Sequence, residues 1–166
     1  MSRTLILVKP SLPALEPKAT ETGRIVAARL AVPIEVIAGL RENDRTGQGW
    51  LGTAELEARI AHFFAEPDRR IMGNETADAA HTRFAAAVED VCARHQTGNI
   101  VVVAHGTVIT LYVARRTGRD PFPFWQRLDL PSFVALSLPG NDAQVICDQV
   151  EAVENSGHFV KGHTRD

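Results

Sequence analysis

The sequence predicts an α/β fold, a three-layer α/β/α sandwich with a mostly parallel sheet. Short runs of apolar and β-branched residues alternate with longer segments in which apolar residues recur every three or four positions, the patterns of strands and amphipathic helices. Two apolar runs on either side of Pro139-Gly140-Asn141-Asp142 predict a hairpin at one edge. A chain of 166 residues, 45% of them hydrophobic, suffices for one core. We expect one domain over residues 1–150 and a flexible tail over residues 151–166.

Charge and hydropathy exclude several classes of partner. With 18 basic and 20 acidic residues the formal net charge is −2, so nothing predicts binding to nucleic acid or to an anionic membrane. The apolar runs are far shorter than the roughly 20 residues of a membrane span, and the block Leu5–Val8 is too short for a secretory signal. We therefore expect a cytoplasmic protein. Cys92 and Cys147 lack the spacing of metal ligands, which predicts buried thiols and no metal or other cofactor.

The first third of the chain predicts a strand, a helix and a second strand. Thr4–Val8 is an apolar, β-branched run that ends at Pro10, because proline can continue neither a ladder nor a helix interior. Residues 17–30 carry a helical pattern that begins at a proline and that Pro33 closes. Ile34–Ile37 then predicts the second strand.

The middle of the chain predicts two amphipathic helices. One begins near Thr53 and ends before Pro67, with its apolar residues on one face. The other follows Asn74-Glu75-Thr76, a segment suited to cap a helix, and Gly98 ends it before an apolar strand over residues 99–104.

The last third predicts a helix, an aromatic segment and the terminal hairpin. Thr107 can cap a helix over residues 108–115. Asp120-Pro121 opens a segment that is rich in phenylalanine and tryptophan. Without a glycine-rich phosphate loop beside it, this segment is more typical of a core or dimer patch than of a cofactor site. We expect the hairpin strands at residues 133–138 and 143–146.

His105 is the first candidate for a functional residue. It follows the apolar strand directly and precedes Gly106 and Thr107. Ligands of α/β proteins collect at the carboxyl ends of strands, where the first N–H groups of the next helix favour anions. The pattern therefore predicts an anion site at His105. The alternative is a partly buried histidine that is hydrogen-bonded to a carbonyl.

Four segments, in this order, resemble motifs of the histidine phosphatase superfamily, which has the phosphoglycerate mutase-like fold. The resemblance covers most of the chain from Pro17 to Leu138. Glu16-Pro17-Lys18-Ala19-Thr20-Glu21-Thr22 is similar to the helix xxRAxxTA, Gly39-Leu40-Arg41-Glu42 to the LRE segment, Gly73-Asn74-Glu75-Thr76 to the GE(S/T) helix start, and Val103-Ala104-His105-Gly106-Thr107-Val108-Ile109 to the second histidine motif.

The resemblance implies a role for several of these residues. His105 would neutralise the oxygens of a phosphoryl group. Glu42 would donate a proton to the leaving group, which requires a carboxyl pKa raised by burial. The residues expected to bind phosphate are Lys9, Lys18, Arg41 and Gly106. Glu75 is expected to act as a charge partner of a helix N-terminus rather than as a catalyst.

The first strand departs from the family pattern LxLVRHG, in which the histidine becomes phosphorylated. Here Lys9 stands in place of the arginine and Pro10 in place of the histidine, and proline has no nucleophilic nitrogen. The other histidines are expected on helices or in the tail. The chain also passes from this strand to the helix of Lys18 where the family inserts another helix and strand. Either an internal piece is missing and the fold is shortened near its N-terminus, or the first strand occupies the place of the family's second strand.

These observations predict a family member with a residual phosphate-binding pocket that is weakly active or inactive. Its ligand would be a small phosphorylated molecule or inorganic phosphate. One alternative is a slow phosphomonoesterase that acts on a small phosphorylated metabolite by direct attack of water, with Glu42 as the acid. The other is a structural or interaction domain whose aromatic segment forms a homodimer.

Overall fold

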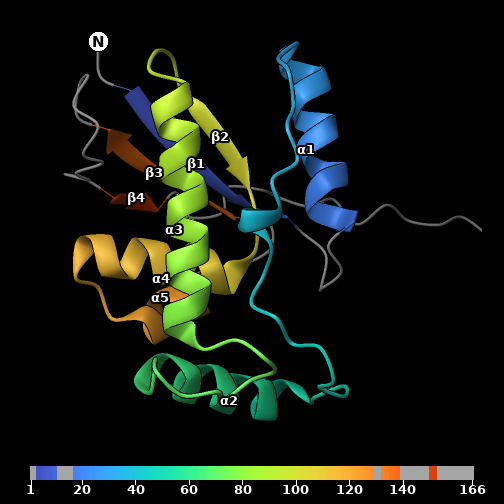
Figure 1. Cartoon of the computed structure of the whole chain (residues 1–166), viewed down its shortest axis with the longest axis vertical. Coiled ribbons are helices and arrows are strands. Elements are labelled where there is room, and N and C mark those ends of the chain that lie inside the picture. Colours follow the sequence, from blue (N-terminus) through green and yellow to red (C-terminus); the bar gives the residue numbers. More distant parts are fainter. Residues whose placement is uncertain (1–2, 11–16, 129–131, 139–149, 153–166) are drawn as a thin grey trace, which may run out of the picture.

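The computed structural model describes residues 3–10, 17–128, 132–138 and 150–152 (Figure 1). The elements, in chain order, are β1 (Arg3–Lys9), α1 (Pro17–Leu30), the 3-10 helix η1 (Ala38–Leu40), α2 (Thr53–Ala65), α3 (Ala77–Arg94), β2 (Ile100–Val103), α4 (Gly106–Thr117), α5 (Pro121–Arg127), β3 (Ser132–Leu138) and β4 (Val150–Ala152). The α/β fold that the sequence predicts is therefore confirmed.

The sheet is mixed rather than mostly parallel, which corrects the sequence prediction. Its described strands lie in the order β2-β1-β3-β4. β1 runs parallel to β2, with Val8 opposite Val103. It runs antiparallel to β3, and β3 is antiparallel to β4. The parallel pair brings the carboxyl ends of β1 and β2 to the same edge of the sheet.

The strand predicted at Ile34–Ile37 is wrong. The segment between α1 and η1 forms no strand, and Ile34 and Val36 are 46% and 68% exposed. An alternating apolar run becomes a strand only where a neighbouring strand pairs with it, and no described strand does so here. The segment instead approaches α1, because a Cβ atom on Gly23 would lie only 3.1 Å from Cδ1 of Ile34.

The first strand of the predicted terminal hairpin is confirmed. β3 begins one residue before the predicted run 133–138, and its antiparallel partner is β4. The predicted strand 143–146 lies outside the described residues. β4 includes Glu151 and Ala152, which the sequence assigned to a tail.

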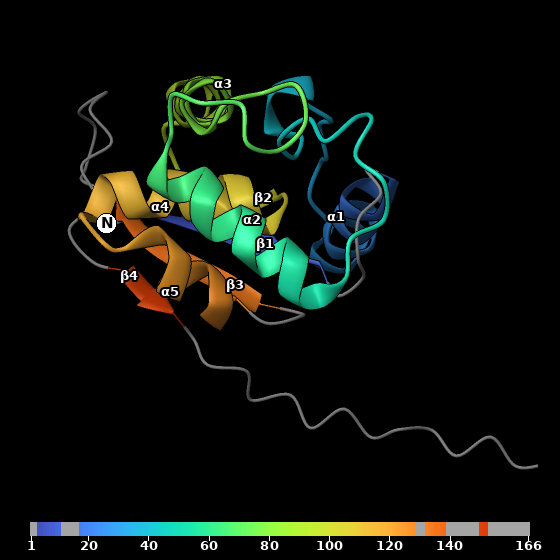
Figure 2. The same cartoon turned by 90° about the horizontal axis from the view of Figure 1, so that it is seen from below.

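The core is formed by one face of the sheet together with α3 and α4, and buried residues of α2 and α5 extend it (Figures 1 and 2). Leu5 and Leu7 of β1 are fully buried there. Phe84 of α3 and Tyr112 of α4 meet edge to face, with their ring centroids 5.8 Å apart. This contact holds α4, whose N-terminus follows β2, against α3.

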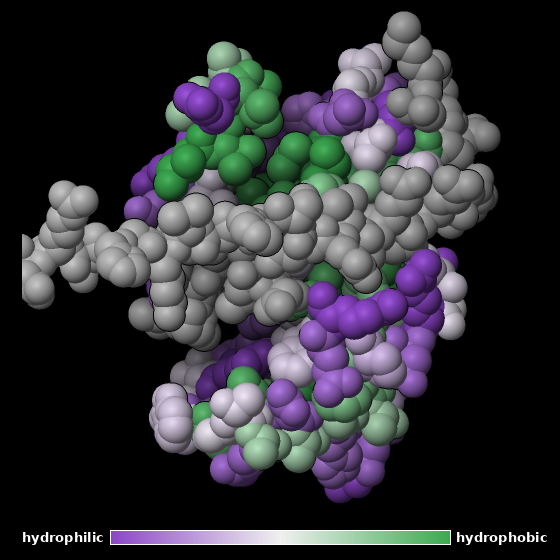
Figure 3. Space-filling view, turned by 180° about the vertical axis from the view of Figure 1, so that it is seen from behind, coloured by the Kyte–Doolittle hydropathy of each residue, from purple (hydrophilic) through white to green (hydrophobic). Residues whose placement is uncertain are grey.

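The second face of the sheet is covered less completely. α1 lies beside β2, where Gly23 approaches Val103, and Val101 and Phe133 are 39% and 40% exposed. Seen from behind, apolar side chains reach the surface on this side of the molecule (Figure 3). The exposed large apolar residues of α1 and the segment after it are Ile25, Leu30, Val32, Ile34 and Val36.

The aromatic segment belongs to the core. Phe124 is buried, whereas Phe122 and Trp125 stack at a centroid distance of 6.1 Å and pack against the core cluster. Cys92 is buried as a free thiol, as predicted, and Cys147 lies outside the described residues. In the described part of the chain, no helix has the length and apolar character to cross a membrane.

Candidate functional site

The candidate site lies where β1 and β2 end together. The carbonyl of Val8 accepts a hydrogen bond from the N–H of Ala104 at 3.0 Å, so Lys9 and His105 follow at the same edge of the sheet. The Lys9 side chain extends along the first turn of α4. A Cβ atom on Gly106 would lie 3.1 Å from Cε of Lys9, so only glycine leaves full room for the lysine. The Lys9 Nζ donates a hydrogen bond to the carbonyl of Leu128.

His105 is the N-cap residue of α4 and is partly exposed. Its carbonyl accepts the N–H of Ile109 at 3.0 Å. Its imidazole forms no hydrogen bond or ion pair with any described residue. The predicted cap at Thr107 is wrong, because α4 begins at Gly106 and the Thr107 hydroxyl accepts a hydrogen bond from Arg45 at 2.7 Å.

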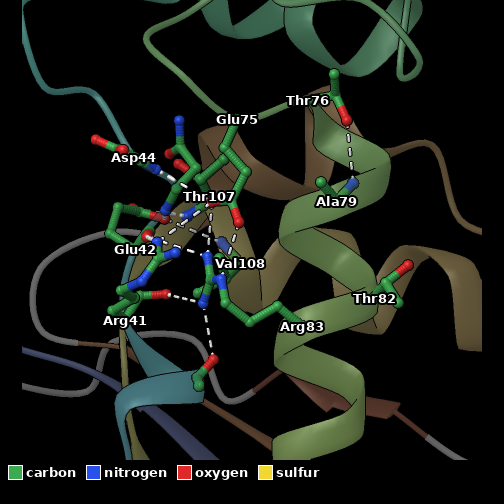
Figure 4. Close-up of polar contacts among 12 residues, drawn as sticks. Arg41, Glu42, Asp44, Glu75, Thr76, Ala79, Thr82, Arg83, Thr107 and Val108 are labelled. Atoms are coloured by element: carbon green, nitrogen blue, oxygen red, sulfur yellow. Dashed lines mark hydrogen bonds and ion pairs between the residues drawn. The ribbon is translucent and has the colours of Figure 1, made fainter.

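The carboxylate of Glu42 occupies the N-terminus of α4. Its oxygens accept hydrogen bonds from the backbone N–H groups of Thr107 and Val108, each at 3.3 Å. One oxygen also accepts the N–H of Asn43 at 3.0 Å. Figure 4 shows Glu42 pointing toward this turn of α4. Helix N-termini favour negative charge because their first N–H groups have no partner within the helix, and here a carboxylate supplies that charge.

Arg83 of α3 holds the loop that carries Glu42 (Figure 4). Its Nε and Nη2 bind the two oxygens of the Glu75 carboxylate at 2.9 and 2.8 Å. The remaining three bonds go to the carbonyls of Gly39, Arg41 and Glu42, at 2.7, 3.0 and 3.2 Å. All five N–H donors of the guanidinium are thus used. Sequence reasoning missed Arg83, because a polar residue on a helix gives no signal of which distant carbonyls it binds.

Glu75, which was expected to act as a charge partner of a helix N-terminus, precedes the N-cap of α3. Its carboxylate lies between the guanidinium groups of Arg41 and Arg83. It accepts hydrogen bonds from Arg83, from the N–H of Asp44 at 3.2 Å and from Arg41 at 3.5 Å. Burial alone would raise the pKa of the Glu75 carboxyl, but the hydrogen bonds from Arg83 and Asp44 and the charges of Arg83 and Arg41 outweigh burial, so the pKa lies below its ordinary value.

Gly73 allows the loop of Glu75 to meet the loop of Glu42. Its φ is +67°, and a Cβ atom there would lie 2.0 Å from the carbonyl oxygen of Asp44, so no other residue fits. The N–H of Asn74 donates to that same carbonyl at 2.9 Å. The glycine of the GE(S/T)-like segment therefore sets the approach of the two loops.

Arg45 is a second residue that sequence reasoning missed. Besides the bond to Thr107, its Nε donates to Oδ1 of Asn43 at 3.1 Å, and its Nη2 lies 3.7 Å from a carboxylate oxygen of Glu42. Asn43 is only 3% exposed. In the sequence, Arg45 stands in a charged loop with no periodic pattern, so no signal separated it from a solvated side chain.

The structure brings four of the predicted site residues together. Lys9, Glu42, His105 and Gly106 meet at the start of α4, whereas Arg41 turns toward Glu75. Lys18 lies in the first turn of α1, partly buried. Pro10 is buried directly after β1, at the position where the resemblance expects the nucleophile.

Solved structures with this fold include several phosphatases. Mycobacterial glucosyl-3-phosphoglycerate phosphatase is 15% identical, with a TM-score of 0.72 over 93% of this chain and 100% of the other, and related structures hold inorganic phosphate or VO3. The α-ribazole phosphatase of Shigella flexneri is 15% identical, with a TM-score of 0.63 over 92% and 96%.

A third similar structure is a histidine-to-alanine mutant of phosphoserine phosphatase from Entamoeba histolytica in complex with phosphoserine. It is 13% identical, with a TM-score of 0.61 over 89% of this chain and 96% of the other. At these identities the likeness shows the fold alone.

No curated protein matches the chain. The model of the histidine phosphatase superfamily (branch 1) matches residues 17–147, a span that contains the Glu42 loop, the Glu75 turn and the start of α4 but not β1. Because this match covers most of the chain, the protein belongs to the histidine phosphatase superfamily.

Proposed function

We propose that this protein binds inorganic phosphate, or the phosphoryl group of a small phosphorylated molecule, at the N-terminus of α4, and that it hydrolyses phosphate esters weakly or not at all. The observation that carries the proposal is the Glu42 carboxylate held by the N–H groups of Thr107 and Val108. A carboxylate there stands in for the oxygens of a phosphoryl group. Lys9 and His105 flank the same turn.

The impaired chemistry follows from Pro10. The pairing of β1 with the strand that ends at His105 supports the first of the two placements, in which β1 corresponds to the family's first strand and an internal piece is missing after it. The residue at its end would have to attack phosphorus, and the proline nitrogen is tied into an amide. Among the described histidines, His62 and His81 lie on α2 and α3 and His95 follows α3, away from this edge. A histidine-to-alanine mutant of a similar phosphatase is found with phosphoserine, which supports binding of a phosphorylated ligand when a histidine is absent.

A second candidate function is slow hydrolysis by direct attack of water, favoured by the position of Glu42 at the anion site itself. The water oxygen would form a bond to phosphorus while the ester P–O bond breaks. A protonated Glu42 would give its proton to the departing alkoxide, and the attacking water would lose one to solvent. This reaction forms no phosphoenzyme, so its time course has no burst.

Two measurements on the full chain separate the functions. A phosphate-dependent rise in melting temperature without hydrolysis of an aryl phosphate is the expected result for the proposed function. Burst-free hydrolysis that is lost in both His105→Ala and Glu42→Gln would instead favour the second candidate. If phosphate at any concentration leaves the melting temperature unchanged and no hydrolysis occurs, both functions are excluded, and a structural or interaction domain remains.

A further inference from the structure

We propose that Arg45 is the side chain with which this protein grips a phosphoryl group, and that it makes the site selective for tetrahedral oxyanions over carboxylates. This inference rests on the proposed function. Arg45 lies outside the motifs that carry the family resemblance.

The Arg45 guanidinium has unused donors. Of its five N–H groups, one on Nε binds Asn43 and one on Nη2 binds Thr107. Among the described residues, Nη1 and the second N–H of Nη2 have no hydrogen-bond partner. Arg83, in contrast, uses all five of its donors on Glu75 and three carbonyls. Arg83 is therefore committed to the loop, whereas Arg45 retains the capacity to bind a ligand.

The unused donors are held next to the anion position. The bond to Thr107 places the guanidinium against the first turn of α4, and the bond to the buried Asn43 orients its plane. The Arg45 side chain is 28% exposed, so it is partly shielded from water and still open to a ligand. Asn43 adds a second unused group, because its buried Nδ2 has no partner among the described residues.

The Glu42 carboxylate does not fill this position completely. Its Oε1 accepts from the N–H groups of Asn43 and Val108, and its Oε2 accepts from Thr107. Arg45 stays 3.7 Å from Oε2, too far for a hydrogen bond. Both oxygens of the Glu42 carboxylate are engaged at the helix N-terminus, and neither completes a hydrogen bond to the guanidinium.

A tetrahedral oxyanion can reach both. With two oxygens at the N–H groups of α4, a phosphate or vanadate still has another oxygen to offer to the Arg45 guanidinium, which forms strong, charge-assisted pairs with phosphate. Such a ligand must displace the Glu42 carboxylate from the helix. The ligand class is therefore a terminal phosphoryl group or free phosphate, and acetate should bind poorly.

The experiment measures the Kd of inorganic phosphate by calorimetry for the full-length wild type, Arg45→Gln, Arg45→Lys and a control, Arg59→Gln. Arg59 is an exposed arginine of α2 that pairs with Glu55. We expect Arg45→Gln to weaken phosphate binding at least tenfold and Arg45→Lys less, because lysine keeps the charge without the planar fork. We expect Arg59→Gln to bind as the wild type does, and acetate to bind the wild type at least tenfold more weakly than phosphate.

A second variant separates ligand binding from folding, because Arg45 also contacts Asn43 and Thr107. In Arg45→Ala, millimolar guanidinium should restore phosphate binding, whereas methylammonium should not. If the wild type binds phosphate and Arg45→Gln binds it with the same Kd, or if guanidinium fails to rescue Arg45→Ala, this inference is overturned and the proposed function stands. If the wild type binds no phosphate, both fall together.

Discussion

At the scale of single residues, the Glu42 carboxylate lies at the same N-terminus of α4 that is proposed to bind phosphate. It accepts hydrogen bonds there from Thr107 and Val108. At the proposed site, a phosphate group would bring two negative charges to the same N–H groups, so the Glu42 carboxylate would compete with it for them. Like charges a few ångströms apart at a partly shielded site repel each other by an energy on the order of 1 kcal/mol.

Removing the charge of Glu42 should therefore strengthen phosphate binding while lowering any turnover. We expect Glu42→Gln to bind inorganic phosphate about tenfold more tightly, a change of about 1.4 kcal/mol, because the amide oxygen still accepts from α4 and the repulsion is lost. Calorimetric titration at neutral pH measures the effect. Glu55→Gln, an exposed carboxylate of α2, serves as the control. Weaker binding by Glu42→Gln would show that Glu42 helps to hold the ligand rather than competing with it.

At the scale of elements, α3 positions the loop that carries Glu42. Arg83 joins α3 to the carbonyls of Gly39 and Glu42 and to the carboxylate of Glu75. The guanidinium and carboxylate are largely buried, with side chains 19% and 11% exposed. Removal of one partner from such a pair leaves a charge without compensation, which costs more than loss of a surface ion pair.

We expect Arg83→Lys to destabilise the protein by about 2–3 kcal/mol, because lysine cannot make the forked contact or reach three carbonyls at once. Urea unfolding measures this change. Arg94→Lys is the matched control on the same helix, because Arg94 forms its ion pairs with Glu35 and Asp90 at the surface and should cost about 0.5 kcal/mol or less. Equal effects for the two substitutions would mean that the Arg83 network contributes no special stability.

The elements that the sequence predicted correctly are those with local signals. Thr76 caps α3, with its side chain accepting the N–H of Ala79 at 3.1 Å, and Gly118 ends α4 with a φ of +69°. Each signal depends only on neighbouring residues, so the helix end can be predicted from the sequence without knowledge of the fold. The strand at Ile34–Ile37 was predicted wrongly because a strand needs a neighbouring strand to pair with. The cap at Thr107 was predicted wrongly because the Thr107 hydroxyl binds Arg45, which comes from a distant loop.

At the scale of the whole molecule, acid should weaken the fold. Burial and the charges of Arg115 and Arg116 lower the pKa of His81 below its ordinary value, partly offset by Asp78, and the pKa of Glu75 is lowered as well. Both groups bind protons more weakly in the folded than in the unfolded state. Their contributions to stability are therefore present above the ordinary pKa values of the unfolded chain, and are lost as pH falls toward the lower folded values.

His81 accounts for the part of this loss nearest to neutral pH. We expect the free energy of unfolding to fall as the pH drops below about 6.5, the ordinary pKa of histidine. His81→Gln should flatten the curve in that window, because glutamine does not titrate. Urea unfolding between pH 7.5 and 5.5 measures it, with the exposed His95 replaced in the control variant His95→Gln. A slope that is unchanged in His81→Gln would assign the acid sensitivity to other groups.

The sequence by itself determined the α/β class, most of the helices, the family and the histidine at the start of α4, because each depends on local periodicity or on a short motif. Only the tertiary structure decided which side chains meet there. Arg45 and Thr107 are 62 positions apart, and Arg83 and Gly39 are 44 apart. Hydrogen bonds over such separations form only after the sheet, α3 and α4 have packed around one core, and no local pattern encodes the partners they will find.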